Sequence, residues 1–312
     1  MKRVLNSIKK RLRVVLSAVI ISLFLFSVLS TPATPNADKR GGIEEANKLV
    51  SAITGFFEEK FSQVSETIES IVRNKSFRMF SLLRPLDTEG NGSKTLPSKV
   101  VGKRVCIDPG HQTRANLAPE PIAPGSSRMK EKCRGGTRGI SSGIPEYKIT
   151  LQIAFKLKNL LERSGIAVVM TRETDDVNIS NIERATIANG IGADLFIRIH
   201  CDGSSDPSVS GITTFYPAKN QWTESIYSES LRAARLVQRE LVKSCNCRNN
   251  GIMPRGDFTG FNWSKVPVIL TEVGFLTNPE EDRLLNGEEY QWKVAQGIHN
   301  GVMRYFAIFD RN

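Results

Sequence analysis

Four side chains in this sequence have the chemistry to hold a metal ion and activate water: His111, Glu146, His200 and Glu272. A catalytic zinc site needs three protein ligands, an open position for water and a base beside it. The chain has only 3 histidines, and two of them close apolar runs typical of β-strands. Because α/β proteins build their sites at strand ends, these four residues are candidates for a catalytic zinc site.

The two histidines follow apolar runs that end in turns or polar loops. In the run from Cys106 to His111, a strand meets Pro-Gly, and the turn delivers His111 just past the strand end. We expect Asp108 to cap this turn rather than to orient the imidazole. His200 ends the apolar run 195–200, before a polar loop that contains glycine.

The two glutamates differ in how strongly they indicate a site. Glu146 begins an amphipathic helix, and by itself it reads as an acid that complements the helix dipole. Glu272 interrupts the otherwise apolar run 269–276. Because burying a lone carboxylate is expensive, Glu272 needs a partner or a catalytic role.

From residue 100 onward, strand-like and helix-like patterns alternate. Apolar runs predict strands at 100–108, 166–172, 193–200, 211–218 and 266–275. Apolar spacings of three and four predict helices at 146–163, 182–191, 224–242 and 289–306, and a further helix start at 280–282. Alternation of this kind predicts an α/β fold, with helices on both faces of one sheet.

The N-terminal third has a different organisation. Six basic residues in the first thirteen precede the uncharged run 14–30, so we expect residues 1–38 to be a signal anchor or a signal peptide, with retention slightly favoured. Either form places the rest of the chain outside the cytoplasm, anchored in the membrane by residues 14–30 or secreted to the cell wall. Residues 39–98 read as a helical stalk and linker, and residues 99–312 as the catalytic domain.

Charge and cysteine content bear on the partners of the chain and on the roles of its thiols. The net charge of +11 comes partly from the basic start, and no nucleic-acid motif interleaves aromatic residues with the basic ones, so we expect no nucleic-acid partner. The 5 cysteines are an odd number for an exported chain, so at least one is unpaired or forms a bridge to another molecule. Cys106 reads as a core residue. Cys201 is disfavoured as a ligand because strand neighbours point to opposite faces.

Five motifs in order carry a family resemblance: IDPGH, PE at a helix start, TR, ADLFIRIH and PVILTEVGFLTNPEE. Together, over residues 104–306, the chain resembles the zinc-dependent N-acetylmuramoyl-L-alanine amidases of the amidase-3 type. The resemblance implies that His111, Glu146 and His200 bind Zn2+ and that Glu272 is the catalytic carboxylate. It implies a three-layer α/β sandwich with a mostly parallel, six-stranded sheet. The implied reaction is hydrolysis of the amide between N-acetylmuramic acid and L-alanine in peptidoglycan.

The sequence departs from the family pattern at Gln112, at Cys201 and in the long basic loop 112–145. In related enzymes an inserted segment occludes the site until a partner moves it, so a regulatory protein acting on this loop is expected to be a partner beside peptidoglycan and the membrane. Two alternatives remain open: another zinc peptidase of similar fold, and a non-catalytic wall-binding regulator. Arg172 and Arg184 read as structural salt-bridge formers, and His299 as a surface or boundary residue.

Overall fold

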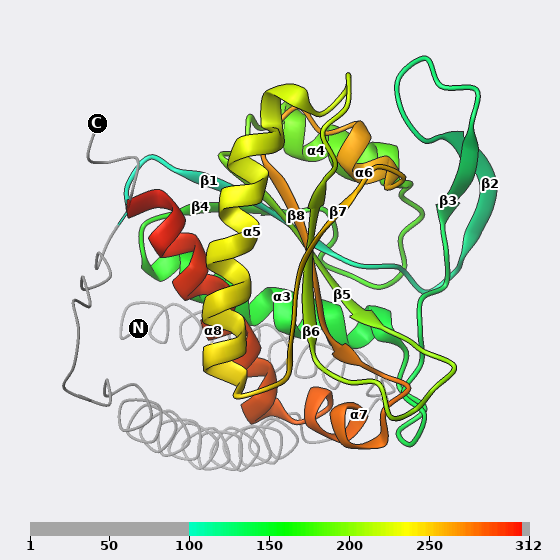
Figure 1. Cartoon of the computed structure of the whole chain (residues 1–312), viewed down its shortest axis with the longest axis vertical. Helices are drawn as coiled ribbons and strands as arrows, with labels where there is room; N and C mark the ends of the chain where they lie inside the picture. The colour runs from blue at the N-terminus through cyan, green and yellow to red at the C-terminus, as the bar shows by residue number, and fades with distance from the viewer. Residues whose placement is uncertain (1–99, 308–312) are drawn as a thin grey trace, which may run out of the picture. The chain divides into compact units, whose positions relative to one another are not determined.

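The computed structural model describes residues 100–307, and the expectations for residues 1–99 lie outside this range. Its central layer is a six-stranded sheet in the order β4-β1-β5-β8-β6-β7 (Figure 1). The strands are β1 (Arg104–Pro109), β4 (Ala167–Met170), β5 (Leu195–Asp202), β6 (Ile212–Pro217), β7 (Asn249–Arg255) and β8 (Val268–Phe275). The expected number of strands is confirmed.

The strands pair mostly in parallel. β1 pairs in parallel with β4 and β5, β5 with β8, and β6 with β7, whereas β6 and β8 run antiparallel. Parallel pairing requires crossover connections, which the helices between the strands supply. The carboxyl ends of β1, β5 and β8 therefore lie at one edge of the sheet, where the candidate histidines were expected.

Helices cover both faces of the sheet. On one face, Ile107, Ile197 and Ile269 share a core with α3 (Glu146–Arg163), α5 (Glu224–Cys245) and α8 (Glu288–Ala307). On the other face, Phe196 and Val268 pack with α4 (Asn181–Gly190) and α6 (Thr259–Asn262). Side chains alternate between the two faces along each strand. The three-layer sandwich follows, with the short α7 (Pro279–Leu285) after β8.

Local signals explain why the helices begin where they do. Pro145 precedes α3 in an extended conformation, and Glu146 lies in the first helical turn, at the predicted boundary. Ser180 and Glu183 form a capping box at the start of α4, in which each side chain bonds the backbone N–H of the other. Asn278 caps α7, and its Oδ1 accepts from the N–H groups of Glu280 and Glu281.

The structure adds elements that the sequence patterns did not indicate. The segment 112–145 contains an antiparallel hairpin of β2 (Asn116–Pro121) and β3 (Met129–Cys133), and β7 forms the edge of the main sheet. β2 and β7 contain prolines, and neither alternates apolar with polar residues. Short edge strands tolerate such sequences because they need few ladder hydrogen bonds.

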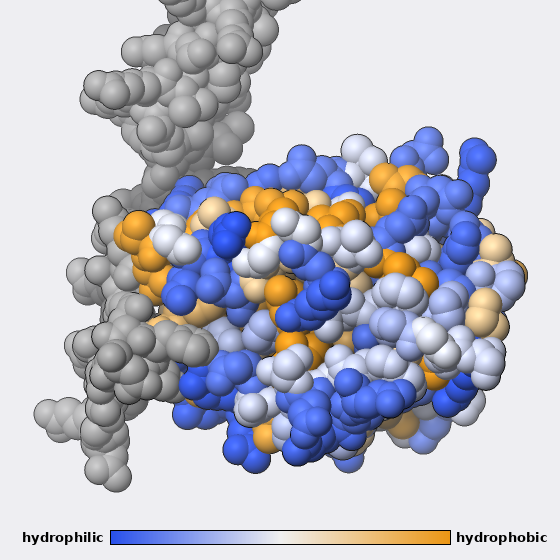
Figure 2. All heavy atoms as spheres, turned by 90° about the horizontal axis from the view of Figure 1, so that it is seen from above, coloured by the Kyte–Doolittle hydropathy of each residue, from blue (hydrophilic) through white to orange (hydrophobic). Residues whose placement is uncertain are grey.

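One face of the described domain carries a mixed surface. Figure 2 shows one face on which hydrophilic side chains are interleaved with smaller hydrophobic areas. Within residues 100–307, no helix has the length and apolarity needed to cross a membrane. The apolar run 14–30 lies outside the described residues.

Candidate active site

His111 lies directly after β1, at the expected strand end. Its backbone has a φ of 61°, in the left-handed region, so the chain turns sharply there. Its Nδ1 lies 2.7 Å from the carbonyl oxygen of Arg134. Because a carbonyl can only accept, Nδ1 must carry the proton of this bond, and Nε2 is left to bind a metal.

Glu146 and His200 meet beside His111. Glu146 Oε2 accepts from the N–H of Thr137 at 2.8 Å, and Oε1 accepts from the N–H of Cys201 at 2.9 Å. His200 comes from the end of β5. Its ring makes no hydrogen bond outside His111 and Glu146 among the described residues, although its Nε2 is buried.

The three donor atoms form a nearly equilateral triangle. His111 Nε2 lies 3.2 Å from Glu146 Oε1 and 3.1 Å from His200 Nδ1, and the remaining side, from His200 Nδ1 to Glu146 Oε1, measures 3.2 Å. A tetrahedral zinc ion with bonds near 2.0–2.1 Å places its ligand atoms roughly 3.3 Å apart. The donor types and their spacing therefore fit a zinc ion. The three side chains would need to move only slightly to bind it.

The charges of the trio suit metal binding. Burial by itself would raise the pKa of Glu146, but the two imidazoles outweigh it and hold that pKa below its ordinary range. Burial lowers the pKa of His200 to about 4, so this ring is neutral near pH 7. Burial opposes the charge on His111, but Glu146 outweighs it and raises the His111 pKa to about 10. A metal ion would displace that proton, since a histidine ligand binds as neutral imidazole.

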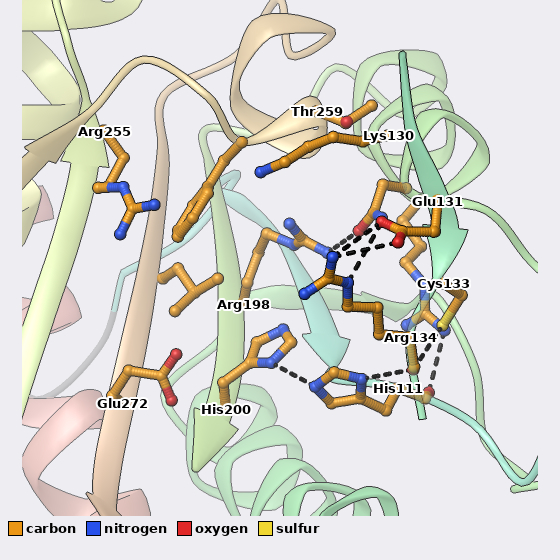
Figure 3. Close-up of a pocket in the computed structure, with 14 residues that line it drawn as sticks. His111, Lys130, Glu131, Cys133, Arg134, Arg198, His200, Arg255, Thr259 and Glu272 are labelled. Atoms are coloured by element: carbon orange, nitrogen blue, oxygen red, sulfur yellow. Dashed lines mark hydrogen bonds and ion pairs between the residues drawn. The ribbon is translucent and has the colours of Figure 1, made fainter. Parts of the chain in front are cut away.

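Glu272 lies beside His200 on the adjacent strand. The two residues are paired in the parallel register of β5 and β8, and Figure 3 shows both side chains extending into one pocket. Burial, followed by the charges of Glu146 and Asp202, raises the pKa of Glu272 well above its ordinary value. Its Oε2 is buried and has no hydrogen-bond partner among the described residues.

Asp108 does not cap the Pro-Gly turn, contrary to our expectation. Its carboxylate is fully buried and accepts from Thr171, from Arg184 at 2.6 Å and from Arg198 at 2.7 Å. Burial opposes the charge, but the two guanidinium groups outweigh it and hold the pKa of Asp108 well below its ordinary value. Asp108 therefore ties the β1 strand to α4 and β5 beneath the site.

The two predicted structural arginines hold the turn before His111. Arg184 pairs with Asp108 and donates to the carbonyl of His111 at 3.0 Å. Arg172 pairs with Asp175 and donates to the carbonyls of Pro109 at 3.0 Å and Gly110 at 2.9 Å. Both salt-bridge predictions are confirmed.

The remaining histidine lies apart from the trio, whereas one cysteine, Cys133, lines the cavity beside His111. His299 is partly buried in α8, and its Nε2 lies 2.8 Å from Ser164 Oγ, as expected for a boundary residue. Cys106 is buried in the core, and Cys201 packs in the core on the face opposite His200. All five thiols are free. Cys201 contributes its backbone N–H to the site, and the Cys133 side chain lies against His111.

The trio opens into a cavity of about 340 Å³ whose walls include residues that the sequence reasoning missed. Phe258 is one of them. Arg198, Lys130 and Arg255 also line the cavity, and Figure 3 shows these three around it. Arg198 interrupts an apolar strand just as Glu272 does, so the same argument could have found it. Lys130 and Arg255 sit on the unpredicted β3 and β7, so no sequence signal placed them at the site.

The motif order and this geometry agree with comparisons to known proteins. The family model of N-acetylmuramoyl-L-alanine amidases matches residues 105–304. The chain belongs to this family. Its relatives include the germination-specific N-acetylmuramoyl-L-alanine amidase of Bacillus subtilis, which is 31% identical over 221 residues, covering 66% of this chain and 80% of the relative.

Solved structures of family members share the fold. The amidase Ami1 of Mycobacterium smegmatis matches with a TM-score of 0.61 and 26% identity, over 68% of this chain and 100% of that one. The amidase CwlD of Clostridioides difficile, solved in complex with the GerS lipoprotein, matches with a TM-score of 0.54 and 26% identity, over 66% of this chain and 100% of that one. These structures show that the chain shares the fold of the family.

Proposed function

We propose that this chain is a zinc-dependent amidase that hydrolyses the bond between the lactyl group of N-acetylmuramic acid and L-alanine in peptidoglycan. One observation carries the proposal: three metal-binding atoms converge to within 3.2 Å of one another, on an amidase-family scaffold. His111, Glu146 and His200 would hold the ion. Glu272, their neighbour across the β5–β8 pair, would be the catalytic carboxylate.

The chain's own residues supply proton transfer and orientation. Zinc, when bound, polarises the carbonyl and lowers the pKa of its water to about 7. Glu272 accepts the proton of the attacking water and delivers it to the departing nitrogen of L-alanine. Its raised pKa suits this role, because a strongly acidic carboxylate would not hold the proton long enough to donate it.

Backbone groups around the site keep the ligands in place. The carbonyl of Arg134 fixes the His111 ring, and the N–H of Thr137 fixes Glu146. Both lie in the segment that follows the β2–β3 hairpin, so that segment orients two ligands at once. Partners of this kind tune metal affinity by about tenfold to a hundredfold.

The location and the partners belong to the same proposal. We propose domains at 1–38, 39–98 and 99–312, with export and membrane anchoring through the run 14–30, or release to the wall if that run is cleaved. The relatives' names support a cell-wall substrate. The solved complex of a related amidase with a lipoprotein supports a regulatory protein, which we propose acts on the 112–145 segment.

A zinc peptidase remains the second candidate because of one feature. Arg198 and Arg255 line the cavity, and a peptidase needs a cationic group to capture a terminal carboxylate. A non-catalytic regulator is disfavoured, since all four candidate residues are present.

Mass spectrometry of peptidoglycan fragments after digestion tests the proposal. The amidase should release the intact stem peptide with a free L-alanine amine, and only when zinc is supplied. A peptidase would shorten the stem instead. Loss of activity with a chelator, and its recovery on adding zinc, should accompany the first result. Intact fragments after digestion with zinc would refute both enzyme assignments.

A further inference from the structure

The face of the sheet that carries the site also carries charged residues further from the strand ends, namely Arg198 on β5 and Asp108 on β1. Along β5, Arg198 stands two positions before His200, so both side chains point to the same face. In the sheet register, Arg198 lies between Asp108 on β1 and Leu270 on β8. Figure 3 shows Arg198 beside His200, extending into the same pocket. The floor of the cavity therefore continues from the metal-binding trio to a guanidinium group.

Behind the trio, this floor holds two guanidinium groups around one buried carboxylate, and Glu272 lines the same cavity. Asp108, Arg184 and Arg198 are 0%, 1% and 4% exposed, and the single carboxylate faces two guanidinium groups. Arg198 donates from Nε to Asp108 and from Nη2 to Asn181, each at 2.7 Å. Its Nη1 makes no hydrogen bond among the described residues. Nη1 is therefore the group of Arg198 that can donate to an anion bound in the cavity.

A second cationic group lies on the wall of the same cavity. The carboxylate of Asp257 pairs with Arg255 at 2.8 Å and with Lys130 at 3.0 Å, so two cations again share one acid. The Arg255 guanidinium stacks 4.4 Å from the centroid of the Phe258 ring, which fixes its plane. Neither cation forms an ion pair with another acid among residues 100–307. The wall therefore presents the Arg255 guanidinium on a rigid support, and the nearby charges of Asp202 and Glu272 also act on it.

From this arrangement we infer that Arg198 and Arg255 form a carboxylate-binding subsite, which selects substrates whose stem peptide carries a free carboxylate beside the scissile amide. The inference rests on the proposed function and names the part of the substrate that the cavity recognises. Nε and Nη2 of both guanidinium groups are already bonded within the protein, so their Nη1 groups would meet the substrate carboxylate. Such charge-assisted bonds are stronger in a partly enclosed cavity than in water. The neutral hydroxyl groups of a glycan would accept weaker hydrogen bonds from these guanidinium groups than a carboxylate does.

A pair of synthetic substrates tests the subsite. Both are N-acetylmuramoyl-L-alanyl peptides, one with a free carboxylate on the residue after L-alanine and one with that group amidated. The wild-type chain should cleave the acid with a kcat/KM roughly tenfold to a hundredfold above the amide. Arg198→Gln and Arg255→Gln should each bring this ratio towards one, mainly by raising KM for the acid.

Controls separate recognition from damage to the fold. Arg239→Gln makes the same chemical change on α5, where Arg239 pairs with Glu240 away from the cavity, and should leave the ratio unchanged. Because Arg198 is buried, its variant can lose stability, and the half-exposed Arg255 then decides the test. Equal cleavage of acid and amide by the wild type, or an unchanged ratio in Arg255→Gln, would overturn the inference.

Failure of the proposed function gives a different result. If the wild type cleaves neither compound, the amidase proposal falls, and calorimetry then decides the subsite by comparing binding of the free acidic peptide with binding of its amide. Tighter binding of the acid, lost in Arg255→Gln, supports the subsite. Equal binding overturns it.

Discussion

His200 and Glu272 occupy paired positions on the neighbouring parallel strands β5 and β8, and both side chains enter one cavity. This pairing places a carboxylate with a raised pKa beside the metal-binding atoms without any loop between them. Two adjacent strands of a packed sheet hold their separation more firmly than loops do. The geometry of base and ligand is therefore a property of the sheet itself.

Glu272→Gln should abolish hydrolysis while leaving the metal site intact. The amide keeps the shape of the side chain but cannot accept the proton of the attacking water, so kcat should fall by about a hundredfold to ten-thousandfold. Zinc content, measured by atomic emission, should stay at the wild-type level. A variant that digests peptidoglycan at the wild-type rate would remove Glu272 from the role of base.

Alanine substitutions in the trio should remove zinc together with activity. Glu146→Ala is the most informative of these variants. An acid in the first turn of a helix can simply stabilise the helix dipole, so this variant distinguishes that role from metal binding. If Glu146 is a ligand, the variant should lose most of its bound zinc after dialysis, as His111→Ala and His200→Ala should. If it is only a helix-dipole acid, zinc stays and stability falls slightly.

The adjacent residue supplies a matched control for the ligand test. Cys201 follows His200 but packs in the core on the opposite face of the sheet. Cys201→Ala should therefore keep its zinc, although a small loss of buried volume lowers stability. Loss of zinc in this variant would point to a thiolate ligand and contradict the assignment.

The sequence predicted best what depends on local pattern. The bounds of α3 follow from Pro145, the acid after it and an apolar stripe, all within one segment. The role of Asp108 was missed because its partners Arg184 and Arg198 lie 76 and 90 residues away. Nothing local distinguishes a buried ion-pair acid from a turn cap.

Family resemblance and tertiary structure supplied what local pattern did not. The resemblance moved Glu146 from a helix-dipole acid to a metal ligand, and the structure brings its carboxylate to within 3.2 Å of both histidines. The hairpin and β7 lack periodicity, so the cationic wall that they carry became visible only in the fold.

Asp108→Asn should destabilise the domain by about 3–5 kcal/mol near pH 7, because it leaves two buried guanidinium groups without their carboxylate. The folded-state pKa of Asp108 lies below its ordinary value of 3.8. Its ion pairs therefore stabilise the domain fully above pH 3.8, and this contribution is lost as the pH falls from 3.8 towards the folded-state pKa. Urea unfolding of both proteins at pH 7 and pH 3 should show the difference shrinking at the lower pH.

An exposed aspartate provides the comparison for that measurement. Asp176→Asn makes the same change at the surface and should alter the unfolding free energy by less than about 0.5 kcal/mol. Equal effects of the two substitutions at pH 7 would show that Asp108 contributes no more than a surface charge.

Gly136→Ala should lower zinc affinity, whereas Gly125→Ala should not. Gly136 has a φ of +78°, and an added Cβ would lie 2.8 Å from both Glu146 Oε2 and His111 Cδ2. Both ligands would have to shift, so zinc affinity should fall by about tenfold to a hundredfold. Competition against a zinc-binding dye measures this loss directly.

Gly125→Ala is the control that separates the steric effect of the added Cβ from backbone strain. The φ of Gly125 is +73°, nearly the value at Gly136, but an added Cβ would meet nothing within 4 Å. Both substitutions carry the cost of a left-handed alanine, about 1–2 kcal/mol, so both should lower the unfolding free energy by a similar amount. Only the change at Gly136 displaces ligands. A parallel loss of zinc in Gly125→Ala would mean that general destabilisation, and not contact with Glu146 and His111, explains the loss.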